Sequence, residues 1–164
     1  MSTRGLLLIR DDSYHLRLAN YIDSDSYPCY SGMGILYFLR TYSNISSLHA
    51  CLSHFRKDNK GLHKDKYIGD GGDILYYSLL HYPIWYKDYR KFINNSVSCK
   101  WAYEINFNTM SLIVYKGLQD KPWSKNQKAD ERGYYPCKPV LTLSFEDIVK
   151  DFKNSSNKLR TLDK

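Results

Sequence analysis

Apolar and polar residues alternate near the start of the chain and again in its middle, with the period of two that is typical of β-strands. Residues 3–10 are rich in Leu and Ile, and residues 15–20 place Leu16 and Leu18 two positions apart. Residues 97–107 and 112–115 repeat the pattern in the second half. Short polar segments rich in Asp, Asn, Ser or Thr separate the members of each pair, which favours turns. The pattern therefore predicts two β-hairpins, with Leu16 and Leu18 facing the core.

Other segments have the spacing of amphipathic helices. Apolar residues follow a helical period in residues 35–42, in residues 45–55 and after Ser144, which is followed by two acidic residues suited to a helix start. Aromatic residues cluster in residues 73–92, where Pro83 interrupts the pattern, so we expect two short helices there. Three prolines, two glycines and many charges predict a loop over residues 117–139.

These elements predict one α+β domain over residues 1–153. The two hairpins supply a small mixed or antiparallel sheet of about four strands, and three to five helices pack mainly on one face of it. A chain of 164 residues lies within the usual size range of a single domain. Residues 154–164 are polar, and we expect them to form a flexible C-terminal tail.

The composition favours a contact surface. Tyrosine contributes 16 residues, and tyrosine is enriched where one end of a side chain packs and the other end meets water. A core that uses Tyr in place of Phe would explain the same number. The net charge is +7, and residues 83–164 carry most of it, with 15 Lys and Arg against 9 Asp and Glu. This basic second half suits a nucleic acid as an alternative partner.

Several classes of protein and site are disfavoured. The only apolar run near the start covers residues 6–9 and is followed by acidic residues, so we expect no signal peptide, no membrane contact and a cytoplasmic location. The four cysteines form no C-x-x-C pair, which argues against zinc and against a disulfide scaffold. His49 and His54 are five residues apart and would point to different faces of a helix. The glycine-rich segment 68–73 lacks the Lys of a phosphate-binding loop and is interpreted as a turn. No cofactor or metal is expected.

Two blocks of the sequence resemble a known family. The first contains Thr3-Arg4-Gly5 and the Asp25-Ser26-Tyr27-Pro28 turn, and the second is the Cys99-Lys100-Trp101-Ala102-Tyr103 segment followed by a Tyr-Lys-Gly-Leu-Gln sequence. They are similar to an uncharacterised family of small bacterial and phage proteins, whose hairpin carries an acid where this chain has Lys100. The resemblance implies a related fold and a phage or mobile-element setting, but no particular chemistry.

One catalytic hypothesis starts at Ser2. Removal of Met1 would leave a serine with a free α-amine at the head of a strand, which is the arrangement of an N-terminal nucleophile hydrolase. Arg4 and Asp25 would then orient an amide or carboxylate substrate. Against this, serine is among the commonest second residues, and related sequences often have Gly or Ala there.

A binding function needs fewer assumptions. Aromatic anchors surrounded by Arg or Lys are what tight interfaces use. In the setting implied by the resemblance, we expect a non-catalytic accessory protein that binds and modulates a host protein or ribonucleoprotein complex, with inhibition of host defence as the concrete form. Nucleic-acid binding, with bases stacked on the aromatic residues of the second hairpin, is a further alternative. The residues expected to contact the partner are Arg4, Asp25, Tyr27, Tyr30, Trp101, Tyr103, Tyr115 and Lys116.

Overall fold

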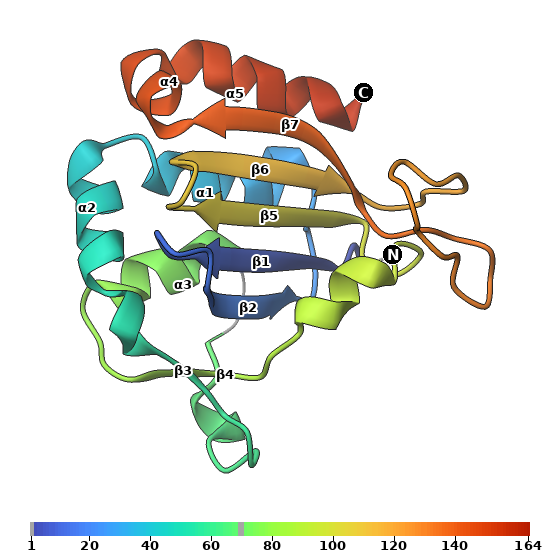
Figure 1. Ribbon diagram of the computed structural model, residues 1–164. Helices are drawn as coiled ribbons and strands as arrows, with labels where there is room; N and C mark the ends of the chain where they lie inside the picture. The colour runs from blue at the N-terminus through green and yellow to red at the C-terminus, as the bar shows by residue number, and fades with distance from the viewer. Residues whose placement is uncertain (1, 69–70) are drawn as a thin grey trace.

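The computed structural model describes residues 2–68 and 71–164, and its centre is a five-stranded mixed sheet with the order β2-β1-β5-β6-β7. The central strands β1 and β5 are parallel, and every other neighbouring pair is antiparallel. Both predicted hairpins are present, as β1–β2 and β5–β6 (Figure 1). The strands are β1 (Gly5–Arg10), β2 (Leu16–Ile22), β5 (Trp101–Asn106), β6 (Ser111–Lys116) and β7 (Lys138–Ser144).

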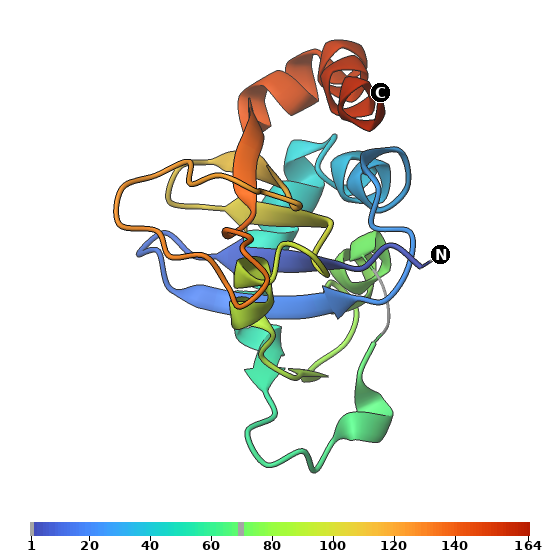
Figure 2. The same ribbon diagram turned by 90° about the vertical axis from the view of Figure 1, so that its right-hand side faces the viewer.

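The helices pack mainly against one face of this sheet, as predicted. Figure 2 shows α1 (Met33–Phe38), α3 (Gly71–Ser78) and α5 (Phe152–Arg160) on one side, whereas the long connection between β6 and β7 lies on the other. Helix α2 (Tyr42–Ala50) stands at one end of the sheet. The fold is therefore α+β, as the sequence predicts.

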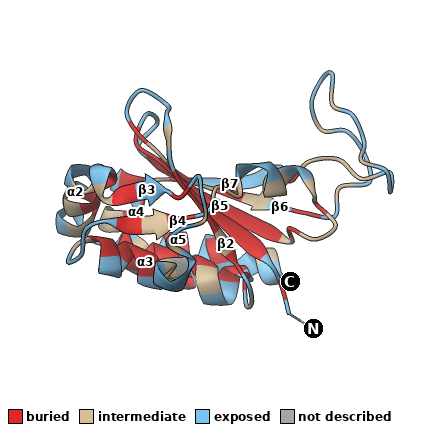
Figure 3. Ribbon diagram, turned by 90° about the horizontal axis from the view of Figure 1, so that it is seen from below, coloured by how far each residue is buried: buried red, intermediate tan, exposed pale blue. Residues whose placement is uncertain are grey.

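One hydrophobic core joins the sheet to the helices. All of β5 is buried, and so are the first five residues of β1, which agrees with their position at the centre of the sheet. Phe38 and Leu36 of α1 and Tyr103 of β5 are completely buried in the same cluster. Figure 3 shows the buried residues along these strands and on the inner sides of the helices.

A smaller unit projects from the main body. Strands β3 (Phe55–Lys57) and β4 (Ile84–Tyr86) form a two-stranded parallel sheet, and the connection after β3 extends away from the main sheet, including the short helical turn η3 (Lys64–Lys66). The carboxylate of Asp58 organises this connection. It accepts hydrogen bonds from the main-chain nitrogens of Leu62 and His63 and from the Tyr67 hydroxyl, at 3.1, 3.0 and 2.7 Å.

The main sheet has one strand more than the predicted four. Strand β7 begins at Lys138, inside the segment 117–139 that was expected to be a loop. Pro139 at its start argues against a central strand, but β7 is an edge strand, where a missing N–H costs little. A register shift between Val114 and Tyr115 lies where Pro139 pairs with β6.

The helical predictions needed other corrections. The predicted helix 35–42 is divided: α1 ends at Phe38, and Thr41 then caps α2 by accepting a hydrogen bond from Asn44 N. The aromatic segment 73–92 forms α3, then β4, and then the short helical turn η4 (Arg90–Asn94) instead of two helices. The predicted turn 68–73 falls partly outside the described residues.

The C-terminal end is helical. The side chain of Ser144 accepts a hydrogen bond from Asp147 N and caps α4 (Phe145–Lys150), as predicted. Residues 154–164 were expected to form a flexible tail. Instead, residues 152–163 form α5 and the short turn η5 (Thr161–Asp163). Leu159 is completely buried, and Asp151 caps α5 through Asn154 N. The buried side of α5 consists of Leu159 with the small residues Ser155 and Ser156, and Phe152 is half-buried.

Candidate binding pocket

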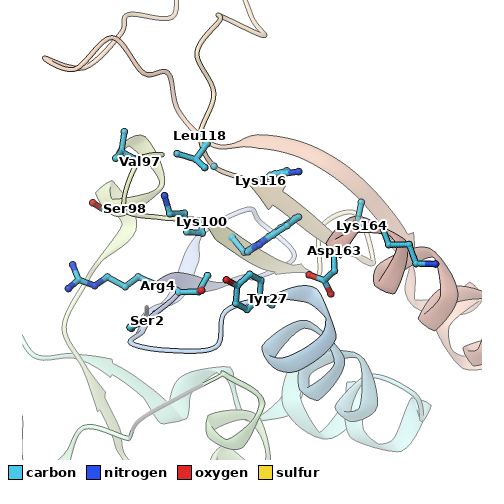
Figure 4. Close-up of a pocket in the computed structure, with 14 residues that line it drawn as sticks. Ser2, Arg4, Tyr27, Val97, Ser98, Lys100, Lys116, Leu118, Asp163 and Lys164 are labelled. Carbon is cyan, nitrogen blue, oxygen red and sulfur yellow. The ribbon is translucent and has the colours of Figure 1, made fainter.

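A pocket of about 600 Å³ lies at the end of the sheet where strands β1 and β5 begin and strand β6 ends (Figure 4). The strand pairing places these ends together. Gly5 is paired in parallel with Trp101, and Trp101 is paired in antiparallel with Lys116. Tyr27 from the turn before α1, and residues 162–164 after α5, complete the wall on the helix side.

Trp101 and Lys116 form one wall of the pocket. The Trp101 side chain is nearly buried, at 5% exposure, and the Lys116 ammonium nitrogen lies 5.4 Å from the centre of its ring. A cation at this distance over an aromatic face is attracted by the ring electrons. The pocket therefore offers an aromatic surface that already holds a positive charge.

The backbone after β6 is fixed in an unusual conformation beside this wall. Gly117 N donates to Lys100 O at 2.8 Å, and a Cβ atom on Gly117 would lie 2.0 Å from the main-chain oxygen of Cys99. Leu118 follows with a φ of +54°, which is uncommon for a residue with a side chain, and its N–H donates to Ser96 O at 2.7 Å. The strained backbone presents the Leu118 side chain, 51% exposed, at the mouth of the pocket.

The charge of the pocket is positive. Arg4, Lys100, Lys116 and Lys164 line it, and among the described residues none of these four forms an ion pair. Asp163 is the one described residue with a carboxylate side chain in the lining, and it accepts a hydrogen bond from Cys29 N at 2.7 Å. Partial desolvation, together with the hydrogen bond and charge of this carboxylate, raises the pKa of the Cys29 thiol, although the residue is exposed. An anionic group entering the pocket would meet unpaired cations.

Hydrogen bonds fix the Asp25–Pro28 turn against the start of β1. Ser26 N donates to Thr3 O at 3.0 Å, and the Ser26 hydroxyl donates to Arg4 O at 3.0 Å. From below, the completely buried Tyr103 hydroxyl donates to Ser26 O at 2.6 Å, and burial raises the pKa of Tyr103 well above its usual value. A Cβ atom on Gly5 would lie 2.5 Å from the Cβ atom of Ser26, so this close approach requires glycine. Tyr27 is thereby held at the pocket wall.

Four of the eight residues expected to contact a partner line this pocket: Arg4, Tyr27, Trp101 and Lys116. These residues are far apart in the sequence, and the parallel pairing of β1 with β5 brings them together. Lys100, which precedes Trp101 in the sequence, also lines the pocket.

The other four lie elsewhere. Asp25 is exposed, and its main-chain oxygen accepts hydrogen bonds from Ser31. Tyr30 lines a separate shallow groove with residues of α1 and α3. Tyr103 is buried beneath the turn, and Tyr115 is paired with Ala102 in the register of β5 and β6, so it points to the opposite face of the sheet from Trp101.

Sequence reasoning missed several lining residues. Lys164 and Leu162 belong to the segment expected to be a tail, and Leu118 to the segment expected to be a loop. A Leu with positive φ leaves no signal in an amino-acid pattern. Leu159 and Leu162, the two apolar residues of the segment 154–164, were the available sign in the sequence that this segment docks on the domain, and Leu159 is completely buried.

The chemistry around Ser2 is limited. Ser2 lines the pocket, and its hydroxyl donates to the main-chain oxygen of Asp23. Among the described lining residues there is no histidine, and Asp25 does not reach the pocket.

Within residues 2–68 and 71–164, no group of three His, Cys, Asp or Glu side chains is placed to hold a metal ion. No helix of the described chain is long and apolar enough to cross a membrane.

Comparisons with protein-family models, with curated proteins and with solved structures found no match for this chain. The resemblance to the small bacterial and phage family therefore stays a prediction.

Proposed function

We propose that the protein is a non-catalytic binding protein that holds an acidic, partly apolar segment of a partner protein in the Trp101 pocket. The observation that carries this proposal is the combination, in one pocket of about 600 Å³, of a nearly buried Trp, an exposed Leu and four cations that form no ion pair with any described residue. Interfaces use aromatic anchors of this kind, surrounded by residues that exclude water. Unpaired cations attract an acidic partner and select against a basic one.

The setting implied by the sequence resemblance makes the partner a host protein or ribonucleoprotein complex. Inhibition of a host defence system is the concrete form of the proposal. The same blocks that carry the resemblance, residues 3–5, residues 25–28 and the hairpin at Trp101, are the ones that pack together around this pocket. This coincidence supports the pocket as the site through which such a protein would act.

The test is selection from a displayed peptide library, followed by identification of host proteins that contain the selected sequence. We expect enrichment of peptides that combine Asp or Glu with Leu or an aromatic residue. The double variant Lys100→Glu, Lys116→Glu should lose them, whereas the matched variant Lys125→Glu, Lys128→Glu, in the exposed connection between β6 and β7, should retain them. No enrichment, or equal loss in both variants, would refute the proposal.

A second candidate is hydrolysis by Ser2, which its position in the pocket wall favours. A hydroxyl at the head of a central strand and beside cations has access to a bound amide or carboxylate. Substitution of Ser2 by Ala is the direct test. If Ser2→Ala retains the full biological effect of the protein, a nucleophilic role for Ser2 is excluded.

A further inference from the structure

A second basic surface lies on the projecting unit. We call residues 55–67 and 84–90 the basic lobe, because the parallel pairing of β3 with β4 brings these two segments together. They contain seven Lys and Arg and three Asp, a net charge of +4 out of the +7 of the whole chain. The two segments of the lobe lie in different halves of the sequence, so the net charge of either half does not reveal the lobe.

The acidic residues of the lobe are mostly engaged within it. Asp58 is 8% exposed and accepts the three hydrogen bonds described above. Asp88 accepts hydrogen bonds from Arg90 N and Nε at 2.9 and 2.7 Å and lies 3.5 Å from the Lys57 ammonium. Both carboxylates also line the notch described below, where four lysines outnumber them, and Asp65, the third, is exposed.

Other cations of the lobe remain available. Lys60, Lys64 and Lys87 are exposed, and among the described residues none of them forms an ion pair. With Lys57 they line a notch of about 410 Å³, which Tyr67 also borders. The hydrogen bonds of Asp58 hold the connection that carries two of these lysines, so the notch is formed before a ligand arrives. A group with several negative oxygens, such as a phosphate, fits this arrangement.

Aromatic rings lie in or next to the same lobe, and one of them contacts a further cation, Arg56. Tyr82 is 54% exposed, and the Arg56 guanidinium lies 4.9 Å from the centre of its ring. His63, from the connection after β3, stacks on Trp85 of β4, with ring centres 3.8 Å apart and planes 11° from parallel. Proteins that bind single-stranded nucleic acid combine such rings, on which bases stack, with cations that follow the phosphates. Tyr82 is the exposed ring of this set, and a purely acidic protein segment without apolar groups would leave that ring without a partner.

We propose that the basic lobe binds single-stranded nucleic acid, with backbone phosphates at Lys57, Lys60, Lys64 and Lys87 and with a base stacked near Tyr82. This surface is separate from the Trp101 pocket and shares no lining residue with it. A protein that binds a host ribonucleoprotein complex would then contact protein through the pocket and RNA through the lobe.

The experiment measures the anisotropy of a fluorescent single-stranded oligonucleotide at increasing salt. We expect affinity to fall with salt, because bound phosphates release counterions. The triple variant Lys60→Gln, Lys64→Gln, Lys87→Gln should bind about 10-fold more weakly or worse. Its plot of log affinity against log salt should be shallower by about 2, since each phosphate contact on a single strand contributes roughly 0.7. Tyr82→Ala should weaken binding about 5-fold or more, since stacking contributes ~1–3 kcal/mol per base.

The control is the triple variant Lys121→Gln, Lys125→Gln, Lys128→Gln. These lysines are also exposed and the change in net charge is identical, so this variant should bind within about 2-fold of the parent protein. Absence of salt-dependent binding, or equal loss in the two triple variants, would overturn the proposal. Stronger binding of duplex DNA, of polyglutamate or of anionic vesicles than of the single strand would overturn it too. The double variant Lys100→Glu, Lys116→Glu, which tests the pocket, should leave this binding unchanged.

Discussion

The Lys116 ammonium lies 5.4 Å from the centre of the Trp101 ring, so the charge of the pocket and its aromatic wall are joined in one contact. Lys116→Met separates the two properties, because Met keeps an apolar stem over the ring and removes the charge. We expect the affinity for an acidic peptide to fall about 10-fold, because a charge-assisted contact contributes roughly 1.5–3 kcal/mol. The free energy of unfolding should change by less than about 0.5 kcal/mol. Calorimetric titration and urea denaturation measure the two quantities. Unchanged peptide affinity would show that the Lys116 charge plays no part in binding.

Gly117 is expected to tolerate no side chain. A Cβ atom there would lie 2.0 Å from Cys99 O and 2.5 Å from Ser96 O, both main-chain atoms that cannot move aside cheaply. Gly117→Ala should lower the free energy of unfolding by on the order of 3 kcal/mol, as steric strain in a packed region does. The control is Gly133→Ala, where φ is +86° but nothing lies within 4 Å, so only backbone strain of roughly 1–2 kcal/mol is added. Equal effects in urea denaturation would mean that the backbone at Gly117 can relax.

The hydroxyl group of the buried Tyr103 is expected to stabilise the fold. It donates to Ser26 O at 2.6 Å, and Tyr103→Phe leaves that oxygen without this donor inside the protein. The expected loss of stability is about 1–3 kcal/mol. Tyr30→Phe, at an exposed site, should change stability by less than about 0.5 kcal/mol. If the two variants have the same melting temperature, the contact does not hold the turn that carries Tyr27.

The pair of Arg10 and Glu104 is expected to be important for stability. Arg10 Nε lies 2.9 Å from a carboxylate oxygen of Glu104, which is 2% exposed and also accepts from Asn106 Nδ2 at 3.1 Å. Removing one member of a fully buried pair costs about 3–5 kcal/mol, and because the Arg10 side chain is 24% exposed, Glu104→Ala should be destabilising by less than this. Glu146→Ala breaks an exposed pair with Lys150 and should have little effect. Thermal unfolding of the two variants makes the comparison. A Glu104→Ala protein as stable as the parent would mean that Arg10 reaches water when its partner is lost.

Acid should loosen the basic lobe through Asp58. Burial alone raises the pKa of this carboxyl, but hydrogen bonds from Tyr67, His63 and Leu62 outweigh it and lower the pKa below 3.8. A carboxyl with a lowered folded-state pKa contributes stability above its unfolded-state value and loses it as pH falls through the folded-state value. The protection of amides in residues 59–67, measured relative to the intrinsic exchange rate at each pH, should therefore fall below about pH 3.8. In Asp58→Asn the exchange should already be fast at neutral pH and should lack this acid step. An acid step that survives in Asp58→Asn would assign it to another group.

The strands and their burial could be predicted where the hydrophobic pattern is local. Leu18 and Tyr103 follow the alternation and are buried. Strand β7 was missed because Pro139 and neighbouring charges suit an edge strand as well as a loop, and amino-acid pattern does not separate the two. The order of strands was also beyond the sequence, since nothing local in Gly5 or Trp101 indicates that they are paired.

The pocket was predictable only in part, for the same reason. Aromatic and cationic residues such as Trp101 and Lys116 can be selected by type, but their meeting with Arg4 and Tyr27 depends on long-range pairing. Tyr103 and Tyr27 are the same residue type, but the Tyr103 side chain is buried beneath the turn, whereas Tyr27 lines the pocket. The sequence does not distinguish these two positions. The basic lobe was hidden because its two segments are joined by the pairing of Phe55 with Ile84.

The parallel pairing of β1 with β5 has a consequence for synthesis on the ribosome. The first strand of the chain can pair at once with β2, but its other edge has no partner until residues 101–106 have left the exit tunnel. Pairing between segments so distant in the sequence is slow and exposes strand edges. During translation, the Leu-rich strand at residues 5–10 is therefore the segment that a chaperone would have to shield.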